Sequence, residues 1–251
     1  MTTTIQIPEV DTEFDNGSFD SAAFAAQTLS SWQSLAAVID HTLLKPDATK
    51  QQVESLCDEV IRYRFACAMV NPMWVPTAVS MLSGTGIPVG VVLGFPLGAT
   101  LVSTLRQEAA MLCRLGAKEL DMVIPIGQLK SGNFQAVQHA VRAVATIAHH
   151  RGALLKVILE TTLLSVEEKL RGAEIAIQSG ADFLKTSTGF ANGGATPADV
   201  ALLRGVAGAR SGVKASGGIR TLADVRSMLE AGANRIGASA SVAIVRELGA
   251  E

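Results

Sequence analysis

Two lysines stand where apolar strand-like runs end, and their amines could form a Schiff base with a carbonyl substrate. Lys185 follows Phe183 and Leu184 and precedes a turn rich in hydroxyl and glycine residues, and Lys214 ends the next predicted strand. Burial disfavours the charged form of a lysine and therefore lowers its pKa. If the two strands are neighbours in a parallel sheet, their axes lie ~4.8 Å apart, and repulsion between the two ammonium groups lowers one pKa further. Because a neutral amine is nucleophilic, the pair predicts Schiff-base chemistry at neutral pH.

An aspartate interrupts another apolar strand-like run. Asp121 lies within residues 119–125, and burial of its carboxylate is costly unless the charge is paired. One interpretation is a purely structural salt bridge to a neighbouring lysine. The interpretation we favour adds proton transfer within that pair, because Lys185 and Lys214 stand at equivalent strand ends.

Asp40 and His41 end the first predicted strand, ahead of Pro46. Taken alone, Asp40 is typical of a cap or turn residue, and His41 of a satisfied polar group at the rim of a barrel. Neither residue by itself predicts a site.

Hydroxyl and glycine residues follow each of the last three predicted strands. The clusters are Ser187-Thr188-Gly189, Ser216-Gly217-Gly218 and Gly237-Ala238-Ser239. Loops at these strand ends of a barrel commonly bind phosphate through backbone N–H groups, although glycines also serve tight turns. No histidine and carboxylate set has metal-ligand spacing, so we expect neither a metal nor another cofactor.

Strand-like and helix-like segments alternate from residue 36 onward. Buried strands are expected at 35–39, 66–70, 89–93 and 154–159, and helices at 101–115, 134–149, 166–178, 197–206 and 222–231. Thr49 with Gln52 and Ser165 with Glu168 offer capping boxes at helix starts. The repeated helix-to-strand unit predicts the α/β fold of a (β/α)8 TIM barrel. A doubly wound sheet is the alternative, but no GxGxxG follows the first strand.

Three of the predicted helices end in a Gly-Ala pair before the next strand. Five residues after the glycine of each pair stand Asp121, Lys185 and Gly237. The shared offset predicts that these three residues lie at matching depth near strand ends, where a barrel builds its active site.

The length of 251 residues suits one such barrel. Residues 1–30 are expected to form an acidic N-terminal extension that runs into a helix over the barrel base, and residues 31–251 a single catalytic domain. The first 44 residues contain no Lys or Arg, so we expect no secretory or transit peptide.

Composition argues against several classes of partner. A net charge of −2 gives no reason to expect nucleic acid or an anionic membrane. The uncharged stretch 65–105 is broken by prolines and glycines, so it contains no run long enough to cross a bilayer. The cysteines Cys57, Cys67 and Cys113 lack CxxC spacing, which is typical of a reducing compartment and predicts a cytoplasmic protein.

Together these residues resemble the deoxyribose-phosphate aldolases, a family of class I aldolases with a (β/α)8 fold. The resemblance is carried by residues 40–45, 93–96, 119–123, 156–161, 183–190 and 213–220. It implies reversible cleavage of 2-deoxy-D-ribose 5-phosphate to D-glyceraldehyde 3-phosphate and acetaldehyde through a lysine Schiff base, without metal or cofactor. It also implies a role in deoxyribonucleotide catabolism and carbohydrate degradation, and a homodimer or homotetramer.

The resemblance further implies a role for ten residues. The catalytic ones are the Schiff-base lysine Lys185, the neighbouring cation Lys214, the acid and base Asp121, and Asp40, which holds Lys214. The substrate-binding ones are the phosphate-binding Gly189, Gly217, Gly218 and Ser239, and the hydroxyl-contacting Thr42 and Thr188.

Two positions depart from the family pattern. Some members have a lysine where this chain has Phe190, so phosphate binding rests more on backbone N–H groups, and greater tolerance of unphosphorylated aldehydes is expected. Many members have cysteine where Met69 stands, which predicts less trapping of a thiol by reactive aldehydes. Cys67, two residues earlier on the same strand face, could fill that place.

Two alternative functions stand beside this one. The first is another Schiff-base aldolase, acting on a keto acid or a ketose phosphate, and the combination of Asp121, Lys185 and Lys214 argues against it. The second is a barrel that binds a sugar phosphate without catalysis. Such a protein has little reason to keep two lysines and two aspartates at strand ends.

Overall fold

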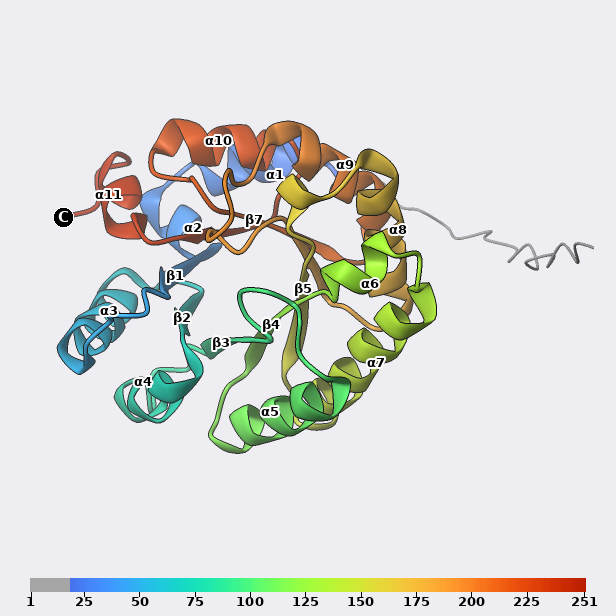
Figure 1. The fold of residues 1–251 in the computed structure, drawn as a ribbon. Coiled ribbons are helices and arrows are strands. Elements are labelled where there is room, and N and C mark those ends of the chain that lie inside the picture. Colours follow the sequence, from blue (N-terminus) through green and yellow to red (C-terminus); the bar gives the residue numbers. More distant parts are fainter. Residues whose placement is uncertain (1–18) are drawn as a thin grey trace, which may run out of the picture.

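Eight parallel strands close into a barrel in the computed structural model of the protein (Figure 1). The structure describes residues 19–251. The strands are β1 (Ile39–Leu43), β2 (Cys67–Val70), β3 (Val89–Leu93), β4 (Glu119–Val123), β5 (Leu154–Ile158), β6 (Phe183–Lys185), β7 (Gly212–Ser216) and β8 (Arg235–Ala238). Each strand pairs in parallel with the next, and β8 pairs with β1 to close the ring. The predicted (β/α)8 barrel is therefore confirmed.

The helices form an outer layer around the barrel (Figure 1). Ahead of β1 lie α1 (Ser21–Thr28) and α2 (Trp32–Ala36). The others are α3 (Lys50–Tyr63), η1 (Pro72–Trp74), α4 (Val75–Met81), α5 (Val102–Arg114), α6 (Ile126–Lys130), α7 (Phe134–His150), η2 (Thr161–Leu163), α8 (Val166–Gln178), α9 (Pro197–Ala207), α10 (Leu222–Glu230) and α11 (Ser241–Arg246).

Two helices begin at the capping boxes that the sequence predicts. At the start of α3, the Thr49 N–H donates to the Gln52 side chain at 2.9 Å, and the Gln52 N–H donates back to the Thr49 hydroxyl. Ser165 and Glu168 form the same pair at the start of α8. Loss of such a cap typically costs about 1 kcal/mol, so these local contacts fix where the helices start.

The first strand lies further along the chain than the sequence predicts. Leu35, expected in a strand, belongs to α2, which Ser31 caps by accepting the Ser34 N–H at 3.1 Å. Asp40 is therefore the second residue of β1 and does not end it. Polar side chains can occupy this strand because they have partners: His41 lies 2.6 Å from the Glu59 carboxylate, and the Thr42 hydroxyl donates to Asp40 O at 2.8 Å.

Asp121, Lys185 and Gly237 lie at matching depth in the barrel, as the sequence predicts. Asp121 lies opposite Lys156, which in turn lies opposite Phe183, two residues before Lys185. The same offset of two residues relates Lys185 to Gly237 on β8. Because the strands of a closed barrel are tilted, residues of one layer on alternate strands differ by about two in register.

Part of the predicted N-terminal extension lies outside the described residues, namely 1–18. The described part contains α1, which begins where the Asp20 carboxylate accepts the Ala23 N–H at 2.9 Å. Helix α1 packs against α10, and the Phe19 ring stacks under the Arg204 guanidinium at 4.1 Å. The boundary between extension and catalytic domain stays a prediction.

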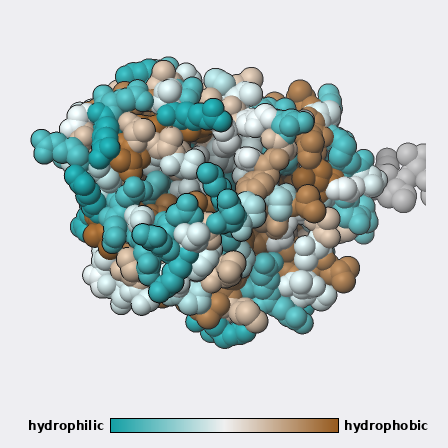
Figure 2. Space-filling view, turned by 60° about the vertical axis from the view of Figure 1, so that its left-hand side comes forward, coloured by the Kyte–Doolittle hydropathy of each residue, from teal (hydrophilic) through white to brown (hydrophobic). Residues whose placement is uncertain are grey.

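The stretch 65–105 folds as short barrel elements. It contains β2, η1, α4, β3 and the start of α5, and between residues 19 and 251 no helix is long and apolar enough to cross a membrane. Figure 2 shows one face of the molecule, on which hydrophilic and apolar groups are interspersed and the apolar groups form small patches.

Candidate active site

Asp121 joins three lysines inside the barrel. Its Oδ2 atom accepts from the Nζ atoms of Lys185 and Lys214, each at 2.7 Å, and its Oδ1 atom accepts from Lys156 Nζ at 2.9 Å. All four side chains are buried. Burial raises the pKa of Asp121, but the three lysines outweigh burial and hold this pKa well below its usual value. The structure thus brings together the predicted residues Lys185, Lys214 and Asp121.

Lys185 has the reactive character expected of a Schiff-base lysine. It lies directly opposite Lys214 on the neighbouring strand. Burial lowers the pKa of Lys185, Asp121 raises it and Lys214 lowers it again, with a result of about 8. About one molecule in ten then carries a neutral amine at pH 7, against roughly one in a few thousand for an ordinary lysine. The largest cause is burial rather than repulsion between the two lysines.

Asp40 holds Lys214 from the other side. Its Oδ2 atom lies 2.5 Å from Lys214 Nζ, and its Oδ1 atom lies 3.1 Å from Arg235. Burial raises the pKa of Asp40, but Lys214, Lys156 and Arg235 outweigh burial and lower it to about 2. Gly237 leaves the space for this pair, because a Cβ atom there would lie 2.9 Å from Lys214 Cε.

Three further charged residues complete the network and are absent from the residues assigned a role in the sequence. Lys156 contacts Glu119 and lies 3.5 Å from Asp40, while Arg235 lies 3.7 Å from Glu119. Burial lowers the pKa of Lys156, but Asp121, Glu119 and Asp40 raise it well above its usual value. Lys156 interrupts an apolar strand as Asp121 does, so the same argument could have found it.

The network carries a net positive charge. Three carboxylates (Asp40, Glu119 and Asp121) face four cations (Lys156, Lys185, Lys214 and Arg235), which leaves an excess of one. An unbalanced positive charge in a buried cluster favours loss of one proton. The pKa of Lys185 is lowered, whereas that of Lys156 is raised.

A cavity of about 400 Å³ opens above Lys185 and Lys214 at the ends of β1, β6, β7 and β8. All six residues predicted to bind substrate line it: Thr42, Thr188, Gly189, Gly217, Gly218 and Ser239. Asp121 and Asp40 lie beneath its floor, in contact with the two lysines.

The two threonines can only accept hydrogen bonds from a substrate. The Thr42 hydroxyl donates to its own strand at Asp40 O, at 2.8 Å, and the Thr188 hydroxyl donates to the Glu160 carboxylate. Each hydroxyl has a single proton and donates it within the protein, so only its lone pairs are available to a substrate in the cavity.

The glycines can donate to a bound anion. Gly189, Gly217 and Gly218 have φ between +79° and +88°, and within residues 19–251 their N–H groups donate to no acceptor. Successive free N–H groups in such turns form a cradle for an anion.

Phe190 lies at the cavity mouth and packs edge-on against Phe95, with ring centroids 5.2 Å apart. It therefore offers an apolar wall where some relatives have a lysine. Two exposed cations, Arg220 and Lys45, line the same cavity. The cavity therefore has cations in its lining, but they come from other loops than the one that carries the lysine in some relatives.

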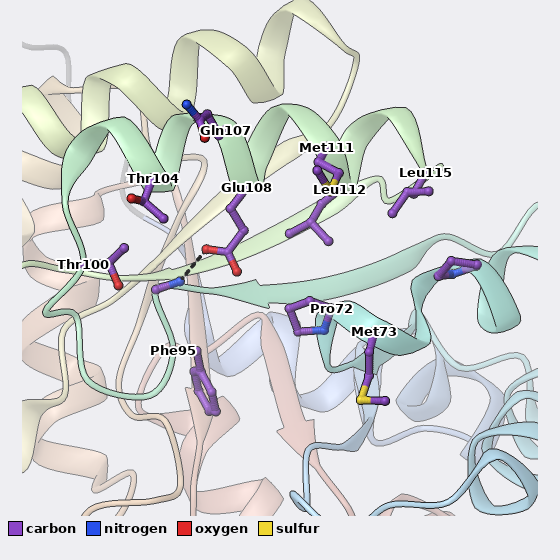
Figure 3. A pocket seen from close by; sticks show the side chains of 12 residues that line it. Pro72, Met73, Phe95, Thr100, Thr104, Gln107, Glu108, Met111, Leu112 and Leu115 are labelled. Carbon is purple, nitrogen blue, oxygen red and sulfur yellow. Dashed lines mark hydrogen bonds between the residues drawn. The ribbon is translucent and has the colours of Figure 1, made fainter.

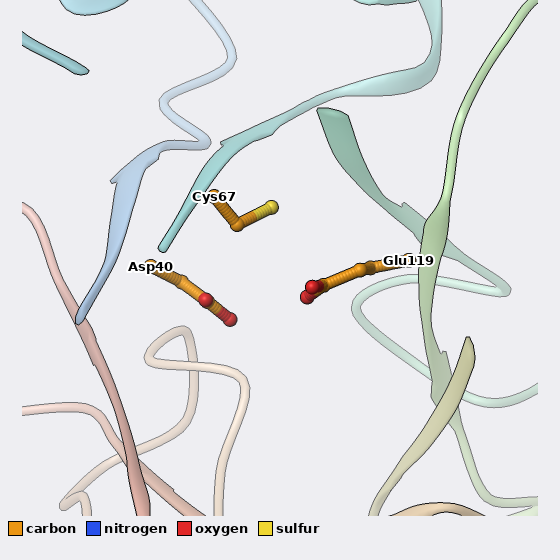
Figure 4. Close-up of side chains that lie close together, drawn as sticks. All are labelled: Asp40, Cys67 and Glu119. Carbon is orange, nitrogen blue, oxygen red and sulfur yellow. The ribbon is translucent and has the colours of Figure 1, made fainter. Parts of the chain in front are cut away.

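Cys67 lies below the cavity and not in its lining. Its Sγ atom and the carboxylates of Asp40 and Glu119 point toward one another in the barrel core (Figure 4). These three could in principle hold a metal ion, but Lys156, Lys214 and Arg235 already neutralise both carboxylates. Burial, reinforced by Glu119, raises the pKa of the Cys67 thiol well above its usual value. A metal would have to displace these cations, so this donor set does not suit one.

Cys67→Ala should leave unchanged the rate at which concentrated acetaldehyde inactivates the protein. The thiol is fully buried and protonated, and only a thiolate that the aldehyde can reach would react. Residual activity after incubation in acetaldehyde measures this. Protection by Cys67→Ala would contradict it and show that the aldehyde reaches the core.

The sequence of the chain matches the family described as DeoC/LacD family aldolase over residues 34–248. The chain belongs to this aldolase family. A deoxyribose-phosphate aldolase of Geobacillus sp. (strain WCH70) is 51% identical over 212 residues, which cover 84% of this chain and 95% of the relative. One of Listeria monocytogenes serovar 1/2a is 52% identical over 212 residues, with the same two shares.

Solved structures of related aldolases have the same fold. The deoxyribose phosphate aldolase of Aeropyrum pernix superimposes with a TM-score of 0.84 at 34% identity, covering 91% of this chain and 96% of that one. Its structure is described as a unique tetramer. The family match spans every predicted site residue of this aldolase, from Asp40 to Ser239.

Proposed function

We propose that this protein is a deoxyribose-phosphate aldolase that cleaves 2-deoxy-D-ribose 5-phosphate reversibly to D-glyceraldehyde 3-phosphate and acetaldehyde. The observation that carries the proposal is Lys185, a buried lysine with a pKa of about 8 that contacts Asp121 at the floor of a cavity. Relatives that are about half identical carry this enzyme name. A non-catalytic barrel would gain nothing from a lysine whose pKa is lowered toward neutral pH.

The proposed reaction uses the network in two steps. The neutral amine of Lys185 attacks the substrate carbonyl, and loss of water gives a protonated imine. The imine nitrogen then accepts electron density as the carbon–carbon bond breaks, so acetaldehyde remains as an enamine. Asp121 lies 2.7 Å from both Lys185 and Lys214, and protons leave and return along this path.

Trapping with borohydride tests the proposal. Acetaldehyde and borohydride should add one reduced two-carbon group to Lys185, found by intact mass and peptide mapping. Because only the neutral amine attacks, the rate of imine formation should rise about tenfold per pH unit up to pH 7 and level off above about pH 8. Labelling scattered over exposed lysines, or no labelling, would contradict the Schiff-base mechanism.

Arg220 is proposed as the side-chain partner of the substrate phosphate. Arg220→Gln should raise the KM for 2-deoxy-D-ribose 5-phosphate about tenfold, since a charge-assisted hydrogen bond is lost. The KM for unphosphorylated 2-deoxyribose should change less than about twofold. Arg226→Gln is the control, because Arg226 is also exposed but does not line the cavity. An equal effect on both sugars would rule out phosphate as the contact.

The flank between η1 and α5 is proposed as a contact between copies of the chain. A second cavity, of about 670 Å³, lies there (Figure 3), lined in part by the exposed side chains of Met73, Met111 and Leu115. Exposed apolar surface of this kind marks an interaction site. A second copy is the proposed occupant because the Aeropyrum pernix relative is described as tetrameric. Light scattering of the purified protein should give a dimer or tetramer, and a monomer would contradict this.

A further inference from the structure

Glu160, two residues after the end of β5, has a backbone conformation that few side chains adopt. Its φ of 57° and ψ of 63° lie in the left-handed region. Within residues 19–251, the other non-glycine residue with positive φ is Arg64, at the end of α3. Such a conformation is unfavourable for a residue with a Cβ atom and persists where surrounding contacts impose it.

The Glu160 carboxylate is buried, and no cation of the described chain pairs with it. Its Oε2 atom accepts the Thr188 N–H at 3.2 Å and also the Thr188 hydroxyl. A buried carboxylate is costly unless hydrogen bonds compensate for lost water. Thr188 donates both of these bonds, so Glu160 and Thr188 act as a unit across 28 positions of the sequence.

This unit shapes the turn that borders the cavity. The Thr188 hydroxyl accepts the Phe190 N–H at 3.0 Å, which closes the chain around Gly189. Thr188 and Gly189 both line the cavity. The Thr188 hydroxyl donates its proton to Glu160 and accepts the Phe190 N–H with one lone pair, so its second lone pair remains for a ligand.

We propose that Glu160 is a positioning residue that makes Thr188 a hydrogen-bond acceptor for a substrate hydroxyl. It does not touch the substrate itself. Because the Thr188 hydroxyl donates its proton to the Glu160 carboxylate, it cannot turn to donate to the substrate, so the site selects an aldehyde with a hydroxyl on C2 over one without it. The inference rests on the proposed aldolase function and deepens it by naming how the acceptor aldehyde is recognised.

Glu160→Gly tests this role without straining the backbone, because glycine adopts positive φ freely. The ratio of kcat/KM for glyceraldehyde over 3-hydroxypropanal, with acetaldehyde as donor, should fall about tenfold. Glutamine keeps an acceptor oxygen, so the ratio of kcat/KM values in Glu160→Gln should stay close to that of the wild type. Asparagine tolerates the left-handed backbone but is too short to reach Thr188, so Glu160→Asn should lower the ratio of kcat/KM values as much as Glu160→Gly does. Arg64→Gly relieves the same kind of strain far from the cavity and should leave the ratio unchanged.

A double-mutant cycle separates positioning from general damage. If Glu160 acts through Thr188, the Glu160→Gly/Thr188→Val protein should have the same ratio as Thr188→Val alone, within about twofold. Additive losses, or a wild-type ratio in both Glu160→Gly and Glu160→Asn, would overturn the inference. In that case borohydride trapping on Lys185 in the wild type would still support the aldolase function, whereas its absence would remove both.

Discussion

Replacing Lys185 with methionine should lower kcat for cleavage of 2-deoxy-D-ribose 5-phosphate by at least about 10⁴-fold. Methionine fills similar space but has no amine to form the imine. Asp121 would keep its contacts with Lys156 and Lys214, so no buried carboxylate is left unpaired and the fold should persist. Release of glyceraldehyde 3-phosphate measures turnover, and borohydride with acetaldehyde should no longer add mass.

Lys118→Met provides the matched control, because Lys118 is exposed at the opposite end of the barrel, just before β4. That protein should keep its activity and its adduct. Residual activity of Lys185→Met within about tenfold of the wild type would mean that another group starts the reaction.

Asp121→Asn should lower kcat by about 10²- to 10⁴-fold, the range typical for loss of a general acid or base. At the same time the pKa of Lys185 should fall further below about 8, because burial already lowers it and Asp121 is the group that raises it. Imine formation at pH 6 should therefore become faster while turnover becomes slower. The pH dependence of borohydride trapping, set beside the cleavage rate, measures both changes.

Asp199→Asn controls for the loss of an ordinary ion pair, since Asp199 pairs with Lys169 at 2.6 Å between α8 and α9. It should reduce stability without changing the pH dependence of trapping. If Asp121→Asn slowed trapping at pH 6, Asp121 would be serving to orient Lys185 rather than to keep it protonated.

Local sequence signals predicted much of the fold and the centre of the site. Capping boxes at Thr49 and Ser165 fix helix starts by contacts within four residues, so they can be recognised without the rest of the chain. Lys185 and Lys214 were recognisable because a charged residue in an apolar run needs a reason to be buried. Their adjacency then follows from the parallel order of consecutive strands.

Other features depend on contacts between distant segments. Strand β1 begins later than predicted, because pairing with β2 and β8 outweighs the apolar pattern around Leu35. Arg235 reaches Asp40 across 195 residues of sequence, and Glu160 reaches Thr188 only because two loops meet.

The lowered pKa of Lys185 also links folding to the release of a proton. In the unfolded chain this lysine has a pKa of 10.5, and in the folded protein about 8. The unfolded state therefore holds one more proton between these two pH values, so the free energy of unfolding rises with pH across that window. Below pH 8 the folded protein bears the full cost of the buried charge, on the order of 3 kcal/mol. Lys185→Met should accordingly melt at a higher temperature than the wild type at neutral pH: the reactive amine makes the native state less stable than its packing alone would allow.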